Sequence, residues 1–387
     1  MKYLFFLGRQ RELSLEELKV VLSRFQDETS ITVVSDEVPD VVSAELQDST
    51  QPQALMDTLG GVVKIAQYIE TLPSAKTETL EELASAWIAE EKTNKARKTF
   101  CIAEHGRNHL DAVSPQTMKK ELIKRGVSAR FIEVARTGAE AGLLLEGDVS
   151  EYHFIHTKTQ TILAKTVAVQ HVHHWSKRDM EKPYRDKKKG MIPPKLARTL
   201  INLAAGSQDP KDLYLFDPFC GTGTIMMEAL LMHMKVAGSD LDTDAVHGAG
   251  ENLAWLSKEF NAQGEYMLSV QDATQVTLKE TKEKVDCIVT EPFLGKPNPT
   301  PTSVQNMLRG LEKLYIGAFK QWKTILKPKG CVVIAFPEVT VGKSVKTVQT
   351  LIDRLESLGY TREKGPFLYT KLHASVQRAL YVYRLKE

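Results

Sequence analysis

The chain contains 387 residues, of which 42% are hydrophobic and 26% are charged. This length predicts two or three domains, and the composition is that of an ordinary globular protein. The 51 Lys and Arg residues are balanced by 49 Asp and Glu residues, which gives a formal net charge of +2. That balance excludes both a highly basic coat for nucleic acid and an acidic disordered chain.

Composition and spacing also disfavour several kinds of site. No apolar run approaches the roughly 20 residues that span a bilayer, and the apolar stretch near residue 5 is too short for a signal peptide. We therefore expect a cytoplasmic location and no membrane partner. The four cysteines lie far apart, which disfavours disulfides and structural zinc. Because His171, His173 and His174 lack carboxylate or thiol neighbours in the sequence, no metal is expected.

Residues 1–75 are predicted to form the first domain. Ser14 followed by Glu17 predicts a capping box at the start of a helix. Pro39 and Asp40 predict a turn between two short strands. The order strand–helix–strand–strand–helix–strand is typical of a ferredoxin-like module. The predicted strands cover 2–8, 31–36, 41–46 and 62–69, and the helices cover 14–25 and 51–60.

Residues 76–175 are predicted to form a second α/β domain. A connector and a charged helix lie within 72–98. A strand at 100–105, a helix at 114–126 and strands at 129–134 and 161–172 follow.

A basic run separates this domain from the rest of the chain. Residues 177–189 contain seven basic and three acidic side chains, so their net charge is 7 − 3 = +4. One interpretation is a solvated linker over 176–189. The other is a hinge that contacts phosphates, because clustered Lys and Arg release counterions on meeting nucleic acid.

Residues 190–387 are predicted to form a large α/β domain. Five strands alternate with helices, which implies a mostly parallel sheet with right-handed crossovers. A closing hairpin over 367–375 and 379–386 adds antiparallel strands at one side. The expected parallel strands are 213–217, 236–240, 266–272, 285–291 and 331–337, and the expected helices are 193–204, 224–233, 245–260, 307–326 and 345–359.

The strongest signal for chemistry lies between the first strand of this domain and the next helix. Gly221 and Gly223 allow a tight turn and a close approach of a ligand to the backbone at the carboxyl end of the strand. The helix that follows favours negative groups at its N-terminus. The segment has neither the Gly-Lys-Ser/Thr of a phosphate loop nor the third glycine of a dinucleotide loop. This glycine loop comprises Asp217, Pro218, Phe219, Cys220, Gly221, Thr222, Gly223 and Thr224.

Acidic residues end the next two predicted strands. Asp240, about twenty residues after the glycines, can accept hydrogen bonds from two ribose hydroxyls, and Leu241 follows it. Asp272 can accept from an exocyclic adenine amine, while Ala273 offers its backbone N–H. A helix cap or a turn is the alternative role for each aspartate. We predict that all four residues contact a nucleoside-containing cofactor.

The fourth predicted strand ends in a carboxylate, a proline carbonyl and an aromatic ring, supplied by Glu291, Pro292 and Phe293. Two acceptors can polarise the N–H bonds of a planar amine while the ring stacks on the base. Alkylation of such an amine requires alignment of the nitrogen with a donor and removal of one proton. The three residues are therefore the predicted catalytic group.

With these segments in this order, the chain resembles class I S-adenosylmethionine-dependent methyltransferases. The glycine loop matches the D-P-F-C-G-[ST]-G-T donor loop of amino-group methylases. More narrowly, residues 7–22 and 191–204 resemble tRNA guanosine N2-methyltransferases (guanine-10) with ferredoxin-like and THUMP domains. The resemblance implies S-adenosyl-L-methionine as cofactor. It also implies a Rossmann-like domain with a mostly parallel seven-stranded sheet, preceded by ferredoxin-like and THUMP-like α/β domains.

The catalytic tetrad departs from the pattern of that family. Family members carry Asp or Asn, then Pro, Pro and an aromatic residue, whereas this chain reads Glu291, Pro292, Phe293 and Leu294 before Gly295. The glutamate adds a methylene, and the aromatic ring stands one place earlier. We predict that Glu291 and the Pro292 carbonyl hold the target amine, with Phe293 or another aromatic ring stacked on the base.

The resemblance further implies that residues 1–175 hold tRNA and set the distance to the target nucleotide. Several basic residues of this part are candidates for contacts with RNA phosphates. For each of them, the alternative is a position on a solvated helix face that contacts no RNA. We predict methylation of guanine N2 in tRNA. The alternatives are a DNA methyltransferase for adenine N6 or cytosine N4, and a donor-binding RNA-binding protein without activity. The candidate phosphate contacts are His105, Arg107, Lys119, Lys120, Lys124 and Arg125.

Overall fold

The computed structural model describes residues 1–26, 30–47, 49–73, 77–91, 97–106, 113–186, 191–370 and 374–387. Contacts divide the chain into two compact units. The first comprises Met1–Arg11, Phe25–Thr58 and Val62–His174, and the second comprises Glu12–Arg24, Leu59–Gly61 and Trp175–Glu387. Among the helices that the structure describes, none has the length and apolar character that crossing a bilayer requires.

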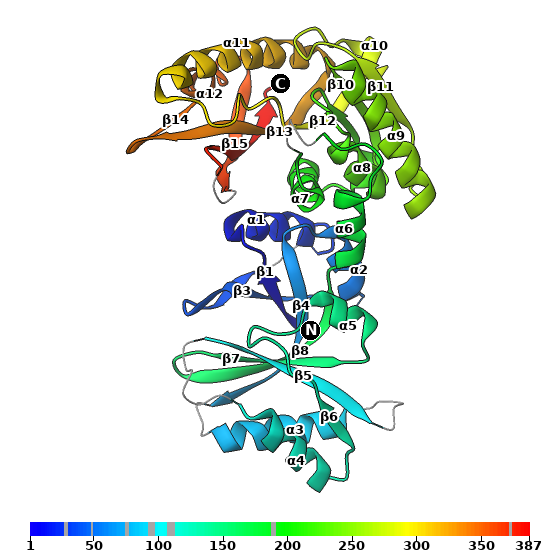
Figure 1. The fold of residues 1–387 in the computed structure, drawn as a ribbon, viewed down its shortest axis with the longest axis vertical. Helices are drawn as coiled ribbons and strands as arrows, with labels where there is room; N and C mark the ends of the chain where they lie inside the picture. Colours follow the sequence, from blue (N-terminus) through cyan, green and yellow to red (C-terminus); the bar gives the residue numbers. More distant parts are fainter. Residues whose placement is uncertain are drawn as a thin grey trace. The chain divides into compact units, whose positions relative to one another are not determined.

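The first unit contains a mixed sheet. Its strands are β1 (Lys2–Leu7), β2 (Thr32–Ser35), β3 (Val38–Glu45), β4 (Val62–Pro73), β5 (Lys98–His105), β6 (Ala129–Phe131), β7 (Ser150–His156) and β8 (Gln160–Val169). Their order is β2-β3-β1-β4-β8-β7-β5-β6, with β5 parallel to both β6 and β7 and the other pairs antiparallel. Figure 1 labels most of these strands. The strands of both predicted N-terminal domains thus share one sheet, and the boundary near residue 75 stays a prediction.

Aromatic and aliphatic side chains of this sheet pack against the helices of the first unit. Phe100 of β5 and Phe154 of β7 are buried together with Met118 and Leu122. These last two residues belong to α4, whose start is fixed by Ser114, because its hydroxyl accepts the backbone N–H of Thr117. The helices assigned here are α2 (Pro52–Thr58), α3 (Thr77–Glu90), α4 (Pro115–Lys124) and α5 (Ala141–Glu146).

Two local predictions for the N-terminal part were wrong. The helix α1 (Arg11–Leu22) begins before Ser14, so no capping box starts there. Instead, the buried Glu17 carboxylate accepts the backbone N–H groups of Gly60 and Gly61, at 2.8 and 2.6 Å. The predicted turn at 39–40 lies within β3, and the chain turns at 36–37.

The second unit contains a mostly parallel sheet. Its strands are β9 (Tyr214–Asp217), β10 (Lys235–Asp240), β11 (Tyr266–Val270), β12 (Val285–Thr290), β13 (Leu326–Val341), β14 (Ser344–Thr347), β15 (Tyr360–Tyr369) and β16 (Val376–Leu385). Seven of them follow the order β11-β10-β9-β12-β13-β16-β15, and β14 pairs with β13. β9 to β13 run parallel, whereas β16 is antiparallel to β13 and β15. The predicted parallel sheet and closing hairpin are confirmed.

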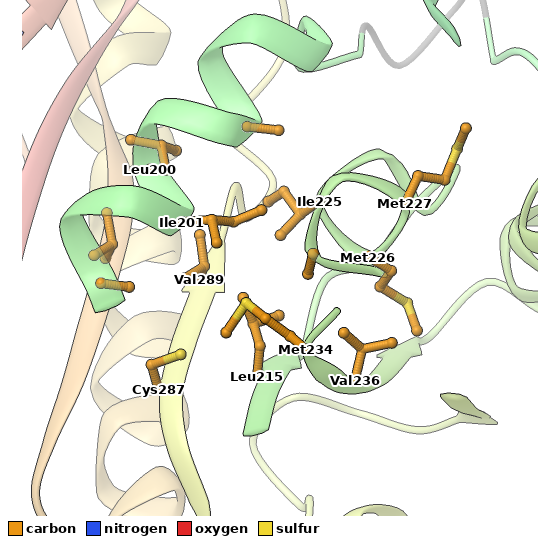
Figure 2. Packing of buried hydrophobic residues seen from close by; sticks show 14 of the residues in the cluster. Leu200, Ile201, Leu215, Ile225, Met226, Met227, Met234, Val236, Cys287 and Val289 are labelled. Atoms are coloured by element: carbon orange, nitrogen blue, oxygen red, sulfur yellow. The ribbon is translucent and has the colours of Figure 1, made fainter. Parts of the chain in front are cut away.

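Helices cover both faces of this sheet. On one face, Leu200 and Ile225 of two helices pack with Leu215 and Val289 of the strands (Figure 2). On the other face, Phe319 and Trp322 pack among Phe216 and Ile334. Neighbouring strand residues thus face opposite cores, which is why these strands read as continuous apolar runs. The helices are α6 (Val172–Met180), α7 (Pro194–Ala205), α8 (Thr224–Leu231), α9 (Thr243–Phe260), α10 (Leu278–Thr281), α11 (Pro301–Ile325) and α12 (Gln349–Arg354), with a 3₁₀ turn at Pro210–Asp212.

The predicted helix over 345–359 was wrong in its first half. Residues 344–347 form β14, which pairs with the end of β13, and α12 covers only Gln349–Arg354. Val345 is 57% exposed, so an apolar periodicity that included it did not mark a buried helix face.

Candidate functional site

The candidate site residues gather at the carboxyl edge of the second unit's sheet. Asp217 at the end of β9 is opposite Gly238 of β10, and Phe216 is opposite Ile288 of β12. This register brings the glycine loop, Asp240 and Glu291 to the same edge. Ligands of open parallel sheets bind at such an edge, beside the loops that follow the strands.

Two glycines with positive φ shape the glycine loop. Gly221 has φ +51°, and Gly223, the N-cap of α8, has φ +76°. A Cβ at Gly223 would lie 3.1 Å from the Cβ of Ala249, so the loop runs close to α9. The backbone N–H of Cys220 donates to the Ser239 carbonyl at 2.9 Å, which ties the loop to β10.

Asp240 is bonded to the loop that it adjoins. Its carboxylate accepts the N–H of Gly221 at 2.9 Å and the N–H of Asp242 at 3.0 Å. The side chain is half-buried, so its remaining lone pairs can accept hydroxyl donors from solvent or a ligand. Leu241 beside it is 72% exposed and offers an apolar surface. The ribose and base contacts predicted for this pair stay predictions.

Asp217 lies beneath the loop. Its side chain is buried, and its Oδ1 accepts the Thr290 hydroxyl at 2.6 Å and the Phe219 N–H at 3.1 Å. Burial raises the pKa of Asp217 to about 7, and the nearby carboxylates of Asp240 and Glu291 add to this shift. Asp217 therefore joins the donor-loop strand to the strand that ends at Glu291. The side chains of Pro218, Cys220, Thr222 and Thr224 are buried as well.

The segment predicted to be a basic linker packs behind the glycine loop. Lys182 is buried, and its Nζ donates to the Thr224 hydroxyl at 2.7 Å, with the Thr222 hydroxyl at 3.4 Å. Burial lowers the pKa of Lys182 to about 8. Asn252 of α9 accepts the Tyr184 N–H at 2.8 Å and donates to the Thr222 carbonyl at 2.8 Å.

A buried ion triad anchors the same segment to α8. Arg178 Nε and Arg198 Nη2 donate to the carboxylate of Glu228 at 2.6 and 2.8 Å, and all three side chains are buried. Lys177 at the surface pairs with Glu259. The interpretation of 177–189 as a solvated linker or a phosphate hinge is thus wrong for Arg178 and Lys182. Lys187, Lys188 and Lys189 lie outside the described residues.

Asp272 stands two residues beyond the end of β11. Its Oδ1 accepts the N–H and the hydroxyl of Thr274, at 2.8 and 2.7 Å. These bonds form a turn, and they leave Oδ2 without a hydrogen bond to any described residue. Ala273 is buried in the core that contains α11. Asp272 can serve the predicted amine contact through Oδ2 while Oδ1 holds the turn.

The predicted catalytic residues follow β12. Pro292 is buried, whereas the Phe293 ring is 58% exposed. The Phe293 carbonyl accepts the Tyr315 hydroxyl at 2.6 Å, which fixes this turn to α11. Glu291 does not project freely, because Arg378 of β16 donates to its Oε1 at 2.6 Å. The loop after β12 thus carries the Glu291 carboxylate, which is fixed by Arg378, close in sequence to the exposed Phe293 ring.

The predicted phosphate contacts of the first unit have different surroundings. His105 packs against Phe6 and lies 3.1 Å from His153 through ring nitrogens. Burial, aided by His153, lowers the pKa of His105 to about 3, which favours a neutral ring, and its phosphate contact stays a prediction. Lys120, Lys124 and Arg125 are exposed on or beside α4, Lys119 is half-buried, and Arg107 lies outside the described residues.

The histidine cluster also differs from its prediction in one respect. The rings of His171 and His174 stack with centroids 4.5 Å apart. His173 Nε2 lies 2.7 Å from Glu146, so a carboxylate absent from the local sequence is supplied by α5.

Four supporting residues of the site were missed in the sequence. Glu228 stands alone in the otherwise apolar stretch TIMMEALLMH, and this isolation was the signal of a buried ion pair. Arg378 is likewise a charged residue within the apolar and aromatic stretch VQRALYVYRL. Asn252 had no distinguishing local pattern, and Lys182 was marked only as part of the basic run over 177–189.

Residues 182–351 match an RMKL-like methyltransferase domain. This match includes the glycine loop, Asp240, Asp272 and the residues after β12. The tRNA (guanine(10)-N2)-dimethyltransferase of Pyrococcus abyssi is 29% identical to this chain over 191 residues, which are 49% of each protein. A "Probable tRNA (guanine(10)-N2)-dimethyltransferase" of Methanothermococcus thermolithotrophicus is 36% identical over 122 residues, which are 30% of this chain and 70% of that protein.

The chain belongs to the tRNA (guanine(10)-N2)-dimethyltransferase family. It spans about half the length of the first curated relatives that it matches. Among solved structures, "a possible methylase from Clostridium difficile 630" has 13% sequence identity and a TM-score of 0.51, covering 98% of this chain and 97% of that one. At this identity, the likeness shows the fold alone. The Rossmann-like class I methyltransferase fold expected for this family is confirmed.

Proposed function

We propose that the protein is an S-adenosylmethionine-dependent methyltransferase that modifies the exocyclic N2 amine of a guanosine in tRNA. Family membership supports this activity. The observation that carries it is the hydrogen bond from Thr290 to Asp217, which joins the glycine loop to the strand that ends at Glu291. The glycine loop and the strand end that carries Glu291 are thereby fixed to each other.

The residues around the glycine loop fit a bound S-adenosylmethionine. A Cβ placed at Gly221 would have only the Phe219 carbonyl near it, at 4.0 Å, so the loop faces open space. The partly exposed Asp240 would hold the ribose, Leu241 would cover one side of the adenine, and Asp272 Oδ2 would accept its amine. When bound, this cofactor supplies an electrophilic methyl group.

Glu291, Pro292 and Phe293 would hold the acceptor. The exposed Phe293 ring is available to stack on a flipped base. The Glu291 carboxylate and the Pro292 carbonyl would accept the N–H bonds of the amine and orient its lone pair. When the nitrogen gains a methyl group, it must lose one proton, and the Glu291 carboxylate is the base positioned to take it.

The first unit would select the RNA. Its described candidates are the exposed or half-buried cations of α4 and of the residue that follows it, which suit phosphate contacts rather than base recognition. We retain Lys119, Lys120, Lys124 and Arg125 as predicted contacts and tRNA as the predicted partner. The ferredoxin-like and THUMP-like domains and the cytoplasmic location belong to this proposal too.

Label transfer from methyl-labelled S-adenosylmethionine tests the proposed function. The full chain is incubated with a tRNA transcript or with duplex DNA, and labelled nucleosides are separated after digestion. We expect N2-methylated guanosine from tRNA and none from DNA. Labelled adenine N6 or cytosine N4 would overturn the proposal in favour of a DNA methyltransferase. Donor binding without transfer to either substrate would point to an inactive RNA-binding protein.

A catalytic variant and a matched control complete this test. Glu291→Gln removes the base but keeps the shape of the side chain, so transfer should fall by about 100-fold or more. Glu363→Gln changes an exposed carboxylate of β15 that pairs with Arg384, and it should transfer at the wild-type rate. Equal rates for Glu291→Gln and wild type would remove Glu291 from the mechanism.

A further inference from the structure

The Glu291 carboxylate is held on one side by a residue from a distant strand. Arg378 Nε and Nη2 each lie 2.6 Å from the same oxygen, Oε1 of Glu291. Both side chains are largely shielded, with 12% of Arg378 and 16% of Glu291 exposed. No described residue forms a hydrogen bond with the other oxygen, Oε2.

Arg378 is itself held in place. Its backbone lies on β16 between Pro337 of β13 and Tyr369 of β15. Its guanidinium stands 5.8 Å from the centroid of the Tyr369 ring, at a cation–π distance. Three neighbouring strands therefore determine where this cation lies.

The loop after β12 has a second tie to the same region. The Asn298 N–H donates to the Ser375 hydroxyl at 2.9 Å, and that hydroxyl donates to Asn298 Oδ1 at 3.0 Å. Ser375 directly precedes β16, and Arg378 lies within it. The segment from Glu291 to Asn298 is thus joined at one end to β16 and at the other to the residue before β16, while the Phe293 ring between them stays exposed.

We propose that Arg378 is the positioning residue for Glu291. This inference rests on the proposed function. By binding Oε1 with two N–H groups, Arg378 fixes the carboxylate in one orientation and turns Oε2 toward the acceptor amine. Glutamate has one more rotatable bond than aspartate, and the contact with Arg378 removes that freedom. The long side chain then acts as a preorganised base.

The position of Arg378 explains how the tetrad of this chain can work. Glu291 reaches across β13 to a cation on β16, and the ion pair sets the direction of its free oxygen. A lone glutamate at this edge could rotate away from the amine. An arginine that instead bound an RNA phosphate would change substrate affinity rather than the chemical step, which separates the two roles experimentally.

The test compares Arg378→Gln, Arg378→Lys and Arg384→Gln in the full chain. Arg384 lies on the same strand and also pairs with a carboxylate, Glu363, so it is a matched control. We measure kcat and KM for tRNA, the Kd of S-adenosylhomocysteine and the thermal midpoint. Arg378→Gln should lower kcat by about 10- to 100-fold because the base is misplaced. KM and Kd should change less than about threefold, since a positioning residue acts on the chemical step through Glu291.

Further outcomes decide the proposal. Arg378→Lys should recover part of kcat through its charge, and the double variant Glu291→Gln with Arg378→Gln should be no slower than Glu291→Gln alone. A wild-type kcat in Arg378→Gln, or a raised KM with unchanged kcat, would overturn the positioning role while the proposed function stands. If the wild-type protein transfers no label to tRNA, both fail. If the Arg378→Gln protein does not fold, Arg378→Lys decides the proposal. We then expect Arg378→Lys to lower kcat relative to wild type without raising KM for tRNA, and a wild-type kcat would overturn the positioning role.

Discussion

The hydroxyl of Thr290 and the carboxylate of Asp217 meet at 2.6 Å beneath the glycine loop. Both side chains are buried, and they stand at the carboxyl ends of β12 and β9. This bond keeps together two loops that are 73 residues apart in the chain. It also places a carboxyl group in an apolar environment, where its ionisation costs free energy.

Asp217→Asn should remove a pH dependence of stability. Burial raises the pKa of Asp217 from 3.8 to about 7, so the folded protein binds a proton more tightly than the unfolded chain. Its favourable contribution is complete below about pH 4 and is lost as the pH rises through about 7. We expect the asparagine variant to gain on the order of 4 kcal/mol relative to wild type over this range. Urea unfolding near the two ends of the range measures this gain.

Thr290→Val is the companion to this experiment. It keeps the shape of the side chain but removes the hydroxyl donor, so it should destabilise the second unit by about 1–3 kcal/mol when Asp217 is ionised. At low pH the loss should be smaller. A variant whose unfolding free energy differed from wild type by the same amount at every pH would show that the bond does not depend on the charge of Asp217.

Lys182→Met should weaken donor binding. The ammonium group donates to the Thr224 hydroxyl from behind the glycine loop, and a hydrogen bond from a charged group contributes about 1.5–3 kcal/mol. Loss of that bond should loosen the loop and raise the Kd of S-adenosylhomocysteine by about tenfold. Calorimetry measures this Kd. Lys177→Met, which breaks a surface pair with Glu259, is the control and should bind as wild type does.

Local sequence was sufficient for the parts of the site that depend on one strand and its loop. Gly221 and Gly223 mark a turn, and Asp240 ends a buried strand at the spacing that predicts a ribose contact. The strands of the second unit were found because residues such as Leu215 and Phe216 face two different cores. Each of these signals lies within a few residues of the feature that it predicts.

Contacts between distant segments could not be predicted from local patterns. Arg378 is 87 residues from Glu291, and nothing near either residue indicates their pairing. The basic run over 177–189 gave a wrong prediction for Lys182. A lysine in a charged segment has similar sequence neighbours whether its side chain is solvated or buried, and Lys182 is buried. Ser14 and Glu17 had the spacing of a capping box, but the backbone N–H groups of Gly60 and Gly61 donate hydrogen bonds to the Glu17 carboxylate instead.

Phe293→Ala should reduce methyl transfer without reducing stability. The ring is 58% exposed, so its removal opens no cavity, and the unfolding free energy should change by less than about 0.5 kcal/mol. Stacking of a base on an aromatic ring contributes about 1–3 kcal/mol, so kcat/KM for tRNA should fall about tenfold or more. Leu368→Ala, which removes another exposed apolar side chain from β15, should leave transfer unchanged. Equal transfer by both variants would show that another ring stacks on the base.

Glu228→Gln tests what anchors the segment behind the glycine loop. Arg178 and Arg198 share this buried carboxylate, and its loss leaves two buried guanidinium groups without the negative charge between them. Because an uncompensated buried charge is costly, we expect a destabilisation of about 3–5 kcal/mol, measured by urea unfolding. Glu259→Gln, which breaks the surface pair with Lys177, should leave the unfolding free energy nearly unchanged because water and salt screen this pair. If both variants lost the same small amount, the triad would not anchor the segment, and Lys182 would depend on Asn252 and Tyr184 for its position.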